Sequence, residues 1–209
     1  MIAASEPVQR PAAARLMVID RAGGITHVPR ASLDRFLRAG DLVVANDATA
    51  LPASLPGVHV RTGNEVEVRL AARRSLEEVC DFTAVIFGAG DFRLRTEDRP
   101  APPPLAEGDQ IAAGPLMVTI RRVLSHPRLA EVHLEGSEDA IWAGLARHGR
   151  LIQYAYLPSA LQFWDTWSPL SGRPVAFEPP SAGFALDWQT VERIRTRGAG
   201  LATLTHTAA

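Results

Sequence analysis

The sequence predicts a mixed α/β fold in which an α/β domain is interrupted by a small antiparallel β-barrel. Strands and helices mix before residue 57 and again after residue 136, whereas several short strands with turn residues between them fill the middle. Short strands at such spacing are typical of small barrels and sandwiches. We therefore expect residues 1–56 and 136–209 to form a discontinuous α/β domain and residues 57–135 to form an inserted barrel-like domain.

Before residue 57 the pattern predicts a loose arm, three strands and one short helix. The arm is the Ala- and Pro-rich segment 1–14. Gly23 and Gly24 supply the turn that makes the first two strands a hairpin. Ser32 is the expected N-cap of the helix, which ends before Gly40. The expected strands are residues 15–20, 25–28 and 42–45.

The inserted part is predicted from alternation and from turn residues. In residues 65–71 apolar and polar side chains alternate with a period of two, as in a strand with two different faces. Gly- and Pro-rich stretches separate the strands of this part. The expected strands are residues 58–61, 65–71, 82–87, 92–96, 117–123 and 129–134.

Two helices and a last strand are predicted after residue 136. Ser137 is the expected N-cap of the first helix, and Gly149 ends it. Gly198 closes the second helix. The segment 150–183 has little periodicity, and five aromatic side chains between residues 154 and 167 either stack nucleic-acid bases or, as we expect, fill the junction between the domains. The elements are a helix at 137–148, a helix at 187–197 and a strand at 201–205.

Composition excludes several classes of protein. The net charge of −1 offers no general attraction for nucleic acid. All basic residues are Arg, so the chain has no amine for Schiff-base or P-loop chemistry. The single cysteine, Cys80, excludes a disulfide framework and a multi-cysteine zinc site, and we expect it to be a buried thiol in a strand. We expect no metal. No apolar run is long enough to span a bilayer, so we expect no membrane partner and a cytoplasmic protein.

The strand at residues 42–45 ends abruptly in two polar, turn-forming residues, Asn46 and Asp47. In open α/β sheets ligands bind at the carboxyl ends of the strands, so this pair is a candidate binding site. The other interpretation is a strand followed by an Asx turn, which is common.

Blocks from both ends of the chain resemble one known family, the S-adenosylmethionine:tRNA ribosyltransferase-isomerases of queuosine biosynthesis. The blocks occur in the family's order and spacing, and the resemblance is diffuse through the expected barrel. They are Arg15-Leu-Met-Val-Ile-Asp20, Gly24-Ile-Thr-His27, residues 37–44, Asn46-Asp47 with Leu51-Pro52-Ala53, Leu145 with His148-Gly149, Pro180-Ser-Ala-Gly183 and Thr203-Leu-Thr-His206.

The resemblance implies an α/β domain with an inserted six-stranded antiparallel barrel. It also implies an enzyme that transfers the ribosyl moiety of S-adenosylmethionine to a deazaguanine base in tRNA, releasing adenine and methionine, without a metal. Such chemistry needs a base beside the carbon next to the sulfonium, and a surface that takes a splayed base. S-adenosylmethionine is then the ribosyl donor and tRNA the macromolecular partner. The oligomeric state is not implied.

The resemblance also implies roles for single residues. His206 matches a family histidine and is the candidate general base, although a residue that merely ends a strand is the alternative. The candidate residues for binding the cofactor or substrate are Asn46, Asp47 and Thr49, followed by Ser181, Ala182 and Gly183. The last three precede a helix, so their amides are suited to an anionic group, with a simple helix lead-in as the alternative.

The sequence departs from the family's pattern at three single positions, in the segment 151–156, where the family has a proline-rich stretch, and in length. Thr49 and Ser54 stand where the family has arginines, and Ala185 stands where it has a histidine. The family also continues beyond the length of this chain. A second hypothesis is therefore a catalytically lapsed homologue that acts as a ligand-binding or assembly module, and a third is a fragment whose missing part completes the site.

Overall fold

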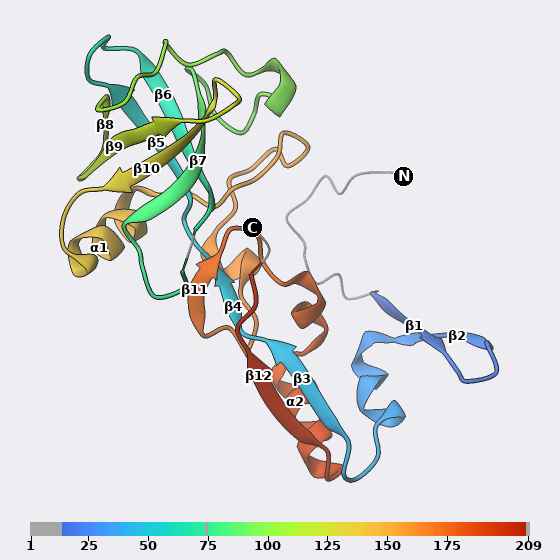
Figure 1. The fold of residues 1–209 in the computed structure, drawn as a ribbon. Helices are drawn as coiled ribbons and strands as arrows, with labels where there is room; N and C mark the ends of the chain where they lie inside the picture. Colours follow the sequence, from blue (N-terminus) through green and yellow to red (C-terminus); the bar gives the residue numbers. More distant parts are fainter. Residues whose placement is uncertain (1–13, 74, 208–209) are drawn as a thin grey trace.

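A closed six-stranded antiparallel barrel and an α/β part make up the fold in Figure 1, a computed structural model that describes residues 14–73 and 75–207. The expected mixed α/β fold with an antiparallel barrel is confirmed. Residues 1–13 of the expected arm lie outside the described residues. The barrel strands are β5 (Ser54–His59), β6 (Glu65–Ala72), β7 (Asp81–Phe87), β8 (Gln110–Ala113), β9 (Leu116–Val123) and β10 (Leu129–Leu134).

Closure follows the order β10-β7-β6-β5-β8-β9, which leaves no unpaired strand edge in the barrel. Branched and small apolar side chains from all six strands fill its interior and remove apolar surface from water. The fully buried members include Leu55, Val68, Leu70, Ala84, Ile86, Ile111, Val118, Ile120 and Leu134.

The strand expected at residues 92–96 is wrong, because this segment is a turn followed by the short 3-10 helix η2 (Thr96–Asp98). The buried guanidinium of Arg99 donates hydrogen bonds to the carbonyls of Gly88 and Gly90, at 3.0 and 2.9 Å. These carbonyls are therefore bound by a side chain rather than by a neighbouring strand. The strand expected at 58–61 begins earlier, at Ser54, although it contains Pro56 and Gly57.

The α/β part contains a hairpin and two small parallel sheets, which Figure 1 shows beside and below the barrel. In the hairpin β1 (Arg15–Ile19) pairs with β2 (Ile25–Pro29). In the sheets β3 (Leu42–Asn46) pairs with β12 (Gly200–Leu204), and β4 (Ala48–Ala50) pairs with β11 (Arg173–Ala176). The strands β4, β8 and β11 have no counterpart among the expected elements. The remaining 3-10 helices are η1 (Arg30–Phe36), η3 (Phe163–Thr166) and η4 (Ser181–Ala185).

Both expected α-helices are present, as α1 (Glu138–His148) and α2 (Trp188–Thr196). The Ser137 side chain caps α1 by accepting a hydrogen bond from the amide of Ala140 at 3.3 Å. The helix expected after Ser32 is instead η1, in which Ser32 is buried and caps nothing. Asp34 of η1 is buried as well, and its carboxylate binds the guanidinium groups of Arg193 and Arg197, which ties η1 to α2.

Two further expectations about side chains are wrong. Cys80 is only partly buried and lies in a bend just before β7, where burial raises the pKa of its thiol. The five aromatic side chains between residues 154 and 167 do not fill a buried junction, because each is at least 41% exposed. Among the described residues no helix has the length and apolar character needed to cross a membrane. The exposed aromatic residues are Tyr154, Tyr156, Phe163, Trp164 and Trp167.

Candidate functional site

The candidate residues Asn46 and His206 meet at the carboxyl ends of β3 and β12, 160 positions apart in the sequence. The amide nitrogen of Asn46 donates to the carbonyl of His206 at 2.7 Å, and its Oδ1 accepts from the His206 amide at 3.0 Å. Because β3 and β12 are parallel neighbours, their carboxyl ends reach the same edge of the sheet. The Asn46 side chain thus fixes the backbone that carries the candidate base.

The imidazole of His206 has no hydrogen-bond partner among the described residues. Residue His206 is exposed. The backbone that carries it is held on both sides by Asn46. A fixed backbone with an unused ring is suitable for a group that must reach a substrate proton.

Asp47 is held by the chain segments around it. Thr205 donates its hydroxyl to Oδ1 of Asp47 at 2.7 Å, and the amide of Gly172 donates to the Asp47 carbonyl at 2.8 Å. A Cβ atom at Gly172 would lie 3.7 Å from the Asp47 side chain. Asp47 therefore lies between the end of β12 and the turn that precedes β11, with one carboxylate oxygen, Oδ2, that makes no hydrogen bond to the described residues.

The same turn leads to the second group of candidate residues. Within it the Ser168 amide donates to Oγ of Ser171 at 2.9 Å, and a Cβ atom at Gly183 would lie 3.7 Å from Oγ of Ser168. Ser181 and Ala182 are exposed in η4, and Gly183 is half-buried. Residues 168–172 thus connect Asp47 with the loop 180–183.

Thr49 lies apart from this arrangement. It is in β4, opposite Pro174 of β11, and is half-buried. The structure brings together Asn46, Asp47 and His206 and connects Gly183 to them through one turn, but it does not bring Thr49 into this group. The roles of all these residues remain predictions.

One cluster offers atoms suited to a metal ion. Cys80, Asp81 and His133 each place one possible ligand atom within 4.8 Å of the others. The carboxylate of Asp81 already lies 2.7 Å from Nδ1 of His133 and accepts from the Cys80 thiol at 3.5 Å. The hydrogen bond from His133 lowers the pKa of Asp81, whereas burial and the adjacent carboxylate raise the pKa of Cys80. The three side chains are thus already joined to one another by hydrogen bonds.

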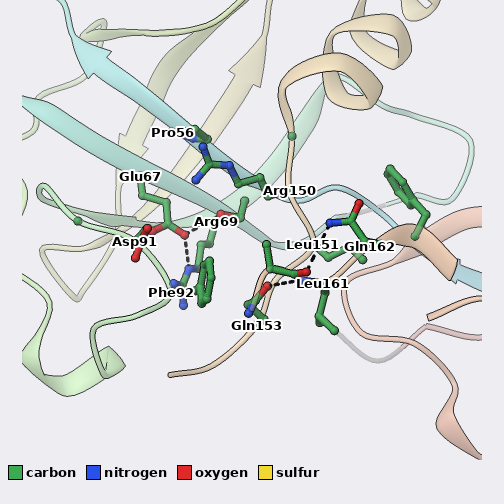
Figure 2. A pocket seen from close by; sticks show the side chains of 15 residues that line it. Pro56, Glu67, Arg69, Asp91, Phe92, Arg150, Leu151, Gln153, Leu161 and Gln162 are labelled. Carbon is green, nitrogen blue, oxygen red and sulfur yellow. Dashed lines mark hydrogen bonds and ion pairs between the residues drawn. The ribbon is translucent and has the colours of Figure 1, made fainter. Parts of the chain in front are cut away.

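A cavity of about 290 Å³ lies where the barrel meets the segment after α1 (Figure 2). Its walls come from β5, β6, the turn at 90–92 and residues 149–163. The backbones of Ser54 and Arg150, which both line it, hydrogen-bond to each other at 2.9 and 2.8 Å. Sequence reasoning identified some of these residues, but for other reasons: Ser54 as a departure from the family's pattern, Gly149 as the end of a helix and Phe163 as one of the aromatic residues. The sequence signal that could have indicated this cavity is the pair Glu67 and Arg69 in a barrel strand, because these two charges alternate with apolar residues.

Glu67 and its partners give the cavity wall its charge. Nε of Arg69 donates to Oε1 of Glu67 at 2.5 Å, Oγ of Ser54 donates to the same oxygen at 2.7 Å, and Arg99 donates to Oε2. Figure 2 shows Glu67 and Arg69 facing each other from β6. Burial by itself raises the pKa of Glu67, but the hydrogen bonds from Arg69, Arg99 and Ser54 outweigh burial and hold this pKa below its ordinary value.

Comparisons with known proteins agree on one family. The sequence matches the profile of a family described as "Queuosine biosynthesis protein" over residues 1–209. It is 29% identical to the S-adenosylmethionine:tRNA ribosyltransferase-isomerase of Sorangium cellulosum over 228 aligned residues, which cover 97% of this chain and 57% of that protein. It is 38% identical to the protein of the same name from Caldanaerobacter subterraneus subsp. tengcongensis over 76 residues, 36% of this chain and 22% of that one.

The chain spans about half the length of the relatives that match most of its sequence, with 57% of the Sorangium protein and 54% of the one from Anaeromyxobacter sp.. A crystal structure of S-adenosylmethionine tRNA ribosyltransferase from Thermotoga maritima is also similar. The similarity covers 98% of this chain and 54% of that one, at 17% identity and a TM-score of 0.32.

Proposed function

Because this chain belongs to the queuosine biosynthesis protein family, we propose that it has the activity after which its relatives are named, S-adenosylmethionine:tRNA ribosyltransferase-isomerase. The ribosyl moiety of S-adenosylmethionine is transferred to a deazaguanine base in tRNA, in the cytoplasm, and adenine and methionine leave. The observation that carries the proposal is the contact of Asn46 with both main-chain groups of His206. It joins two blocks of the family's pattern from opposite ends of the chain into one site.

Most candidate residues have a role in this proposal. The imidazole of His206 takes the proton from the carbon next to the sulfonium, acting as the general base. Asn46 orients the backbone of this base. The free carboxylate oxygen of Asp47 accepts from a ribose hydroxyl, and Thr49, which lies apart in β4, has no role in this arrangement.

The loop with Ser181, Ala182 and Gly183 completes the substrate site. Its exposed hydroxyl and the amides of Ser181 and Ala182 contact the substrate, whereas the amide of Gly183 donates to the carbonyl of Pro180 at 2.9 Å; the small Gly183 allows the substrate to approach closely. The exposed aromatic residues at 154–167 give the tRNA a surface on which bases stack, at about 1–3 kcal/mol per base.

The test is adenine release from S-adenosylmethionine in the presence of tRNA that carries the deazaguanine precursor, together with the mass of the modified nucleoside. His206→Gln is expected to reduce the rate by about 10²- to 10⁴-fold, the usual contribution of a general base. His126→Gln is the matched control, because His126 is an exposed histidine between β9 and β10, outside the family's blocks, and its replacement is expected to leave the rate unchanged.

The outcomes separate the proposal from its alternative. A rate unchanged by His206→Gln contradicts the role of His206. Binding of S-adenosylmethionine without adenine release supports a ligand-binding module that has lost catalysis, which the loss of two family arginines at Thr49 and Ser54 would explain. Absence of any heat on mixing the protein with S-adenosylmethionine and tRNA contradicts both the proposed activity and the ligand-binding module.

A further inference from the structure

Arg69 is a buried cation that uses only part of its hydrogen-bonding capacity. The residue is 7% exposed and lines the cavity of Figure 2, and its Nε donates to Glu67. Its two Nη atoms make no hydrogen bond to any residue that the structure describes. The ring of Phe87 lies 4.9 Å from the guanidinium carbon and offers no acceptor oxygen. An Nη edge with four N–H groups is therefore available to a ligand.

The buried charges around Arg69 do not balance. Glu67 supplies one negative charge, and both Arg69 and the fully buried Arg99 bind it. The other guanidinium contacts of Arg99 are neutral main-chain carbonyls. Glu67, Arg69 and Arg99 together thus have a net positive charge inside the protein, where an uncompensated charge is costly.

The rim of the cavity adds positive charge rather than removing it. Arg150 lines the cavity, and its guanidinium makes no hydrogen bond to the described residues. Figure 2 shows its side chain extending toward Pro56 across the cavity. The nearby carboxylate of Asp91 is already bound by the guanidinium and the amide of Arg93. A ligand that restores neutrality must therefore be an anion.

The shape and chemistry of the walls favour a carboxylate over a phosphate. The two Nη atoms of a guanidinium match the two oxygens of a carboxylate. A phosphate dianion would be repelled more strongly than a carboxylate by the nearby carboxylates of Glu67 and Asp91. Phosphates are also often bound by the first amides of a helix, and the first residues of α1 and α2 do not line this cavity. The remaining walls carry the apolar side chains of Phe92, Leu151, Leu161 and Phe163, suited to an aliphatic or thioether chain.

We propose that this cavity binds the carboxylate of the methionine moiety of S-adenosylmethionine through the Nη edge of Arg69. The identity of the ligand rests on the proposed function, since S-adenosylmethionine is the proposed substrate with such a carboxylate. The volume of about 290 Å³ suits an amino-acid side of the molecule, with the apolar walls around its carbon and sulfur atoms. Arg69 is then a substrate-binding residue, and Arg150 strengthens the same attraction at the rim.

The test is isothermal titration calorimetry of the full chain with S-adenosylmethionine, L-methionine, L-methioninol and inorganic phosphate. L-methioninol has a hydroxymethyl group in place of the carboxylate. We expect Arg69→Gln to weaken binding of S-adenosylmethionine and L-methionine by about 10- to 100-fold, the range for a charge-assisted hydrogen bond. Arg122→Gln is the matched control, because Arg122 is an exposed arginine of the barrel in an ion pair outside the cavity.

A second variant keeps the test decisive if Arg69→Gln does not fold. Ala160→Phe places a ring in the cavity and leaves the ion pair of Glu67 untouched, because Ala160 lines the cavity from the loop after α1. We expect it to weaken binding at least 10-fold, with an unchanged circular dichroism spectrum.

The inference is overturned if either folded variant binds S-adenosylmethionine as the wild type does, if L-methioninol binds as tightly as L-methionine, or if phosphate displaces L-methionine. Arg69-dependent binding of L-methionine without binding of S-adenosylmethionine supports the cavity and contradicts the proposed function. Binding of S-adenosylmethionine that does not depend on Arg69 supports the proposed function and contradicts the role of the cavity.

Discussion

Replacement of Glu67 by Gln is expected to lower the free energy of unfolding by about 3–5 kcal/mol, because it removes the anion that two buried guanidinium groups share. The side chain of Arg99 is 0% exposed, that of Glu67 5% and that of Arg69 8%, so bulk water screens the unbalanced charge only weakly. The glutamine of this variant still has an amide oxygen that can accept from Ser54. The loss therefore measures the charge rather than the shape of the side chain.

The assay is urea denaturation followed by far-ultraviolet circular dichroism, with Glu97→Gln as the matched control. Glu97 forms an ion pair with Arg95 in which both side chains are more than 60% exposed, and an exposed pair is expected to contribute about 0–1 kcal/mol. A loss of less than about 1 kcal/mol in folded Glu67→Gln would refute the reasoning, because the buried cations would then be neutralised by something other than Glu67.

Two further changes test the electrostatics and the packing of the barrel. Asp109→Asn is expected to destabilise the protein at neutral pH, because the hydrogen bonds from Arg61 hold the pKa of Asp109 well below its ordinary value. The difference from the wild type should be constant above about pH 4 and shrink below it, and urea denaturation that shows no shrinkage down to about pH 2 contradicts this. Gly144→Ala should lower the melting temperature although alanine favours helices by about 1 kcal/mol, because its Cβ atom would lie 2.4 Å from Cδ2 of Leu116, and overpacking costs about 1–3 kcal/mol. A higher melting temperature by calorimetry would show that Leu116 moves aside freely.

Local signals predicted those elements whose ends depend on their own residues. Ser137 caps α1 as expected, since its hydroxyl needs only the amide of Ala140 nearby. Strand β10 has the expected bounds, because alternation and turn residues define both of its ends. The strands β4, β8 and β11 were missed because each has only three or four residues and exists through its partner.

The candidate site was predictable only in part. The polar pair Asn46 and Asp47 is visible as a strand that ends abruptly, and a resemblance identified His206. That Asn46 binds the backbone of His206 depends on the parallel pairing of β3 with β12. No local pattern contains this pairing, because it joins segments 160 residues apart.

The sequence by itself determined the mixed α/β fold with a barrel, both α-helices and the family blocks at the two ends of the chain. Only the tertiary structure decided the environment of Glu67 and Arg69, which alternation alone assigns to the solvent face of β6. The segments 88–99 and 149–163 cover that face, so both charges are buried and Arg99 joins them. The physical reason is that alternation reports which residues share a face, whereas burial depends on what distant parts of the chain place over it.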